Sequence, residues 1–135
     1  MSHAKIRAGF EGALKTWADA QVPAIPIAWP NTVFDPPTGR FIRANLIPAD
    51  TKKLFFDGTG RTWKGIFQAT FYMPLGTGAG TVESLAASLD AAFADSFTYS
   101  GVRIYLLSPL SLAADLPNPE RYVVPVSAEY RADTL

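Results

Sequence analysis

The chain has 135 residues, 48% of them hydrophobic, with no cysteine, one histidine (His3) and a formal net charge of zero. This length predicts one domain over residues 1–135, with enough apolar side chains for its own core. The composition excludes disulfides and thiolate metal sites and argues against a histidine metal cluster or a Ser-His-Asp triad, so we expect no cofactor, no metal and no catalytic residue. No apolar run is long enough to cross a bilayer, and we expect a soluble protein made in the cytoplasm.

An amphipathic helix is predicted at the start of the chain. Ser2 can cap it, and it should run to about Gln21. Spacings of three and four residues place its apolar side chains on one face, which we expect to pack in the core. These side chains are Ile6, Phe10, Ala13, Leu14 and Trp17.

A proline-rich connector is predicted from Val22 to Gly39. Its five prolines fix the backbone in an extended form, with room for one short strand at Ile25 to Trp29. The connector is too apolar for a free linker, so we expect it to lie against the domain.

A hairpin of two strands follows the connector. Ile42, Ala44 and Leu46 alternate with polar residues, and Asp57-Gly58 marks the turn. The returning strand, of about eleven residues, has an apolar face and a polar face and should be antiparallel and half-buried. The apolar face holds Trp63, Phe67, Ala69, Phe71 and Met73, and the polar face holds Thr62, Lys64, Gln68, Thr70 and Tyr72.

A glycine-rich turn, Gly76 to Gly80, is predicted to open a second helix capped by Thr81. The inner stripe of this helix is Val82, Leu85, Ala86, Leu89 and Phe93, and its outer face is Ser84, Ala87, Ser88 and Ala91. Such small, weakly charged side chains allow another surface to approach closely.

Two further strands are predicted to close the chain, one through Val102, Ile104 and Leu106 and one from Tyr122 to Tyr130. Pro125 stands in the middle of the last strand and requires an open side or a bulge. The expected fold is therefore α+β, a small antiparallel or mixed sheet flanked by two main helices.

The candidate chemical sites are weak. The Gly76 to Gly80 loop could cradle a phosphate, but no lysine follows its last glycine, as a P-loop requires. The carboxylate pairs Asp50 with Asp57 and Asp90 with Asp95 have no sign of a cleft around them. A basic strand face with Tyr72 could contact nucleic acid, but a protein contact or plain solvation fits the zero net charge better.

Charge is distributed unevenly along the chain. From Arg40 to Lys64 there are six bases and two acids, a net of +4, and from Thr81 to Glu120 there are five acids and one base, a net of −4. Contacts between unlike surfaces of neighbouring copies build rings, although ordinary surface scatter could give the same pattern. The interface candidates are Arg40, Arg43, Lys64 and Tyr72 on one side and Glu83 and Asp90 on the other.

Four segments together resemble the phage tail-terminator-like proteins of long-tailed phages and prophages, similar to the tail terminator of phage lambda. They are the amphipathic first helix, Arg40 to Pro48 (RFIRANLIP), Met73 to Leu89 (MPLGTGAGTVESLAASL) and Arg121 to Thr134 (RYVVPVSAEYRADT). The resemblance implies a non-enzymatic virion protein at the tail terminus. It would form a homo-oligomeric ring, usually a hexamer, that caps the tail tube and joins the head.

The partners implied by this resemblance are further copies of the chain, the major tail tube protein and a head-completion or neck protein, with no membrane and no sequence-specific nucleic acid. The alternatives are another head–tail joining protein or, from a different class, a phosphate- or nucleic-acid-binding module.

Overall fold

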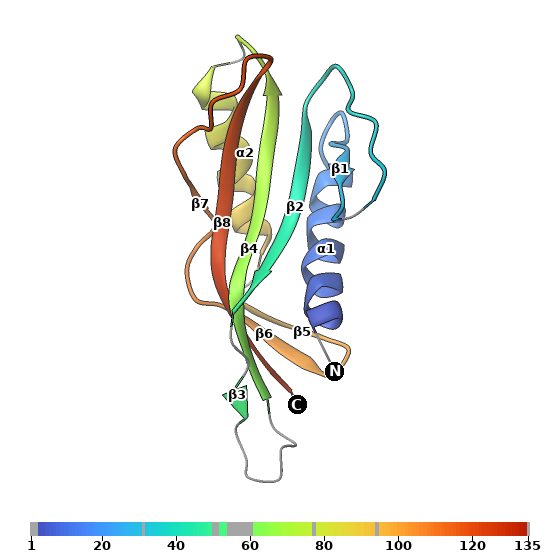
Figure 1. Cartoon of the computed structure of the whole chain (residues 1–135), viewed down its shortest axis with the longest axis vertical. Coiled ribbons are helices and arrows are strands. Elements are labelled where there is room, and N and C mark those ends of the chain that lie inside the picture. The colour runs from blue at the N-terminus through green and yellow to red at the C-terminus, as the bar shows by residue number, and fades with distance from the viewer. Residues whose placement is uncertain are drawn as a thin grey trace.

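A curved sheet forms one layer of the protein and two helices cover one of its faces (Figure 1). The structure, a computed structural model, describes residues 3–30, 32–49, 52–53, 61–76, 78–93 and 95–134. The elements are α1 (His3–Asp19), β1 (Ile27–Ala28), β2 (Phe41–Pro48), β3 (Lys52–Lys53), β4 (Arg61–Pro74), α2 (Ala79–Ala92), β5 (Ser96–Tyr99), β6 (Val102–Leu106), β7 (Ser111–Leu112) and β8 (Arg121–Thr134). The predicted α+β fold with two main helices is confirmed.

Strands β4 and β8 form the centre of the sheet. The strand order is β1-β2-β4-β8-β6-β5, with β3 paired to β4 and β7 paired to β8. All pairs are antiparallel except β1 with β2, so the sheet is mixed. The predicted returning strand is confirmed but is longer than expected, at 14 residues. The predicted Asp57-Gly58 turn and the Ser2 cap lie outside the described residues.

The core lies between the helices and the apolar face of the sheet, as the alternation predicted. Phe10 of α1 stacks on Phe67 of β4 with 4.6 Å between ring centroids, and Trp17 packs on Phe71 at 6.1 Å. From α2, Leu89 is fully buried, while the helix is anchored to α1 by a hydrogen bond from Trp17 Nε1 to the Ser88 hydroxyl (3.1 Å). This packing holds the two helices on the same side of the sheet and leaves the other face uncovered by helix.

The connector between α1 and β2 packs against the domain over part of its length: Ile25 and Ala28 are buried, as predicted, while Val22 and Val33 are exposed to solvent. Its short strand β1 is confirmed within the expected Ile25 to Trp29 segment and runs parallel to β2. The guanidinium of Arg121 donates hydrogen bonds to the backbone carbonyls of Gly39, at 2.7 Å, and Pro37. Two distant segments of the sequence are therefore tied together at one end of the sheet.

The start of α2 differs from the prediction. Gly78 is the N-cap residue, with φ +80°, and no side chain caps the helix. The helix begins at Ala79, so Thr81 is already inside its first turn and the predicted Thr81 cap is wrong. The reason is that Gly76 and Gly78 both adopt positive φ, which lets the chain turn into the helix earlier. This supports the reading of the glycine loop as a strand-to-helix turn.

Two short strands were not predicted, β5 and β7. Strand β5 forms a hairpin with β6 through Ser100-Gly101, both with positive φ. At Pro125, the carbonyl accepts a hydrogen bond from the Ala113 amide (2.9 Å) just beyond β7. Because the amide and carbonyl of a strand residue point to the same side, the missing N–H of Pro125 faces this short edge and not β4. This arrangement agrees with the open side that was predicted at Pro125.

Candidate assembly surfaces

The outer sheet face, which points away from α1 and α2, carries an unusual row of apolar side chains. Ile47 pairs with Ile66 between β2 and β4, and Ile66 pairs with Glu129 between β4 and β8. The amide of Leu107 donates to the carbonyl of Glu129 (2.8 Å), which brings Leu107 to the same level. We call Ile47, Ile66 and Leu107 the aliphatic row.

The aliphatic row is exposed to solvent. The exposed fractions are 48% for Ile47, 37% for Ile66 and 55% for Leu107. Scattered surface hydrophobic residues are ordinary, whereas Ile47 and Ile66 are direct cross-strand neighbours, and Ile66 and Leu107 line one hollow on either side of Glu129. Such patches commonly mark contact surfaces. The row is therefore the strongest indication of a contact surface on this face.

A hollow of about 340 Å³ opens beside the aliphatic row. Its lining is Ala49, Lys64, Gly65, Ile66, Leu107, Glu129 and Tyr130. The hydroxyl of Tyr130 is buried and has no hydrogen-bond partner among the described residues. Its burial raises the pKa of Tyr130 to about 12, because the ionised phenolate would lose its hydration.

Basic side chains flank the aliphatic row on the outer sheet face. Arg43 lies over the Tyr72 ring at 5.9 Å, and Lys64 is exposed opposite Arg131 in the next strand. Arg131 is held by two hydrogen bonds to the Asp133 carboxylate, at 2.9 and 3.1 Å, which raise the pKa of its guanidinium. Arg43 and Lys64 make no ion pair among the described residues. Both predicted bases are thus exposed on this face.

The other two residues predicted for the basic side, Arg40 and Tyr72, already have partners within the subunit. The Arg40 guanidinium donates to the Pro23 carbonyl (2.9 Å) and the Tyr72 ring stacks on Phe41 with 4.6 Å between centroids. Both side chains are half-buried. Their contacts stabilise the connector and the end of the sheet, which is a structural role.

The exposed face of α2 lies on the helical side of the protein, away from the outer sheet face (Figure 1). Ser84, Ala87, Ser88 and Ala91 are all exposed, as predicted, and Glu83 is exposed beside them. No lysine or arginine occurs between Lys64 and Arg103, so this helix presents only small and acidic side chains. The basic residues and the acidic residues of the predicted charge pairing therefore lie on different surfaces of one subunit.

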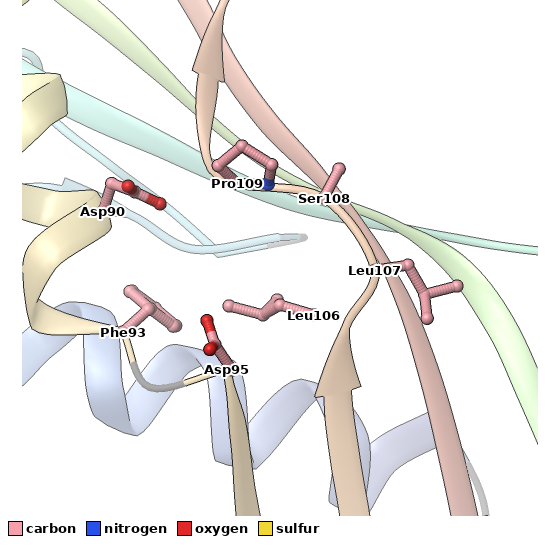
Figure 2. Close-up of a pocket in the computed structure, with 7 residues that line it drawn as sticks. All are labelled: Asp90, Phe93, Asp95, Leu106, Leu107, Ser108 and Pro109. Atoms are coloured by element: carbon pink, nitrogen blue, oxygen red, sulfur yellow. The ribbon is translucent and has the colours of Figure 1, made fainter.

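The carboxylates of Asp90 and Asp95 do line a hollow, which corrects the expectation that no cleft surrounds them. Figure 2 shows both side chains turned toward the space between the end of α2 and the segment from Leu106 to Pro109. Asp90 accepts a hydrogen bond from the Leu110 amide (2.9 Å). This predicted interface residue therefore fixes the loop after β6 within its own subunit. In the described part of the chain, no three His, Asp or Glu side chains group as metal ligands.

These features describe an α+β domain with an exposed aliphatic row on its outer sheet face and a face of small and acidic side chains on α2. Residues 5–130 match the family model of the phage tail terminator protein, and the chain belongs to that family. The family is one of structural phage tail proteins, as the sequence resemblance implied.

The fold also agrees with a solved structure that is 37% identical to this chain. The match covers 98% of this chain and 96% of the other, with a TM-score of 0.81. Among curated proteins none matches this chain. Over the described residues, no helix is long and apolar enough to span a membrane.

Proposed function

We propose that this protein terminates a phage tail by forming a ring of identical subunits, a hexamer, that caps the tail tube and offers the surface to which the head is joined. The observation that carries the proposal is the family match over residues 5–130. The two unlike surfaces support it, because a ring closed by head-to-tail contacts buries two different patches on each subunit. The role is structural, in a virion, and involves no catalysis.

The test is an assembly experiment with purified components. The chain is mixed with assembled tubes of the major tail tube protein from the same tail operon and viewed by electron microscopy, while native mass spectrometry measures the mass of the chain alone and with the tube. We expect a ring of six copies at one tube end. Rings that bind only a head-completion protein would assign the chain to the neck, and the absence of any oligomer under both conditions would refute the proposal.

Within this ring, we expect charge to set the register of neighbouring subunits. Arg43 and Lys64 of one copy would lie toward Glu83 of the next. Exposed pairs contribute only about 0–1 kcal/mol each, so their main effect should be on encounter rate and register. Changing Arg43 and Lys64 to Glu should weaken assembly, and the added change Glu83→Lys should partly restore it, as measured by light scattering across salt concentrations. If assembly depends neither on salt concentration nor on these substitutions, the proposed charged contact is wrong, but the ring itself is not refuted.

The conformation and composition of the glycine loop favour a strand-to-helix turn over a nucleotide-binding site. Gly76 and Gly78 use positive φ to turn the chain into α2, and neither lysine nor arginine lies in the loop or in α2. We expect no saturable binding of ATP or GTP at micromolar concentration in a calorimetric titration. Saturable binding that is lost on Gly78→Val would instead assign a phosphate site to this loop.

A further inference from the structure

The aliphatic row is well suited to a partner that is flat, small in its side chains and acidic at its edges. Ile47 of β2, Ile66 of β4 and Leu107, which directly follows β6, carry large aliphatic side chains. The row crosses four strands, about 14 Å at the usual strand spacing. Along β4, Lys64 is the outer-face residue next to Ile66. Arg43 lies on β2 on the opposite side of the row, four residues before Ile47, so basic side chains flank the row on both sides.

The exposed face of α2 has those complementary properties. Its 14 residues span about 21 Å, enough to cover the row. Ala87 and Ala91 are one helical turn apart and exposed, so large aliphatic side chains can approach the helix backbone closely. Acidic groups border this face, with Glu83 on the helix and Asp115 across a hollow of about 220 Å³ that both residues line.

Nucleic acid fits the outer sheet face less well. Glu129 stands inside the aliphatic row, and the charge of Arg131 is already matched by Asp133. A phosphate backbone would place negative charge against Glu129 and would leave the row's apolar side chains without apolar contacts. Protein association, by contrast, buries apolar surface at the centre and leaves charge at the rim.

We propose that the aliphatic row of one copy packs against the exposed Ala87–Ala91 face of α2 in the next copy, an inference that rests on the proposed ring. Row and helix face lie on different sides of one subunit, so each copy offers its row to one neighbour and its α2 to the other. Arg43 and Lys64 then approach Glu83 and Asp115 at the rim. The aliphatic side chains of the row supply most of the affinity, and the charges at the rim orient the contact.

The absence of cysteine makes a clean cross-linking test possible. The variant Ile66→Cys/Ala87→Cys is treated with a flexible bis-maleimide at concentrations where the protein assembles, and the products are separated on a denaturing gel. We expect a ladder of covalent oligomers up to the ring size. The matched control is Ile66→Cys/Thr16→Cys, which moves the second cysteine to an exposed position on α1 and should give no such ladder.

A second pair of variants tests the energetic role of the row without cross-linking. Ile66→Asp should weaken self-association about tenfold or more, because a carboxylate would be buried in an apolar contact. Leu75→Asp changes another exposed aliphatic side chain, 59% exposed and outside the row, and should leave self-association unchanged. Circular dichroism of both variants shows that the fold is intact.

The outcomes separate this inference from the proposed function. If rings form but Ile66→Cys/Ala87→Cys gives no ladder, or gives no more than the control, the contact is wrong and the terminator role stands. If Ile66→Asp leaves self-association intact and abolishes binding to DNA, the outer sheet face is a nucleic-acid surface and the inference is overturned. If no oligomer forms with or without the tail tube, both proposals fall together.

Discussion

Gly65 offers the sharpest single test of the packing. A Cβ added at Gly65 would lie 2.4 Å from the Ile47 carbonyl oxygen and 2.7 Å from the Tyr130 hydroxyl oxygen. Ordinary carbon contacts begin about 1 Å further out, so Gly65→Ala must displace the β2 backbone or the buried Tyr130 ring. Forced overpacking of this kind destabilises by about 3 kcal/mol, at the upper end of the usual range.

The matched control is Gly12→Ala, on the exposed face of α1, where an added Cβ meets nothing within 4 Å. Alanine in the interior of a helix is more favourable than glycine by about 0.5–1 kcal/mol, so this variant should be more stable than the wild type. The same chemical change is therefore expected to have opposite signs at the two positions.

Both variants are measured by urea denaturation followed by circular dichroism, with thermal melts as a second probe. The expected loss for Gly65→Ala is about 10 °C in melting temperature. A Gly65→Ala protein whose free energy of unfolding matches the wild type within about 0.5 kcal/mol would show that β2 and Tyr130 are not packed against this glycine as described. Such a result would also mean that the hollow beside the aliphatic row, which Gly65 and Tyr130 line, does not have the described shape.

Three further predictions concern the core, a buried hydroxyl and a loop anchor. Phe67→Ala should destabilise by about 3–5 kcal/mol in urea denaturation, because Phe67 is 1% exposed and stacks on Phe10; a loss under about 1 kcal/mol would contradict this packing. The wild type should lose roughly 2–3 kcal/mol of stability between about pH 10 and 12, because burial raises the pKa of Tyr130 from its usual value near 10 to about 12 in the folded state; Tyr130→Phe should lack this decrement, and identical pH profiles would refute the shift. Asp90→Ala should leave the Leu110 amide without its acceptor and cost about 1–3 kcal/mol, whereas Asp90→Asn, which keeps an acceptor, should cost less; equal effects would mean that the hydrogen bond contributes little.

The sequence by itself determined the layers of this protein. Alternation with a period of two in β4 and β8 assigns each side chain to one face of the sheet, because successive residues of a strand point to opposite faces whatever the neighbouring strands are. Spacings of three and four did the same for α1 and α2. A local signal for β5 was also present in the sequence, because Ser100-Gly101 is a tight turn between two short strand-like runs, which is a hairpin pattern.

Only the tertiary structure decided which side chains share a surface. Ile47, Ile66 and Leu107 are far apart in the sequence, and they become one row because β2, β4, β8 and β6 pair in a particular order and register. Long-range pairing of this kind depends on how the whole core packs, and no local pattern encodes it. The same holds for Asp90, whose carboxylate looks like a surface charge until the chain after β6 brings the Leu110 amide to it. The chemistry of each residue was readable along the chain, while its neighbours, and hence its function, were set by the folded sheet.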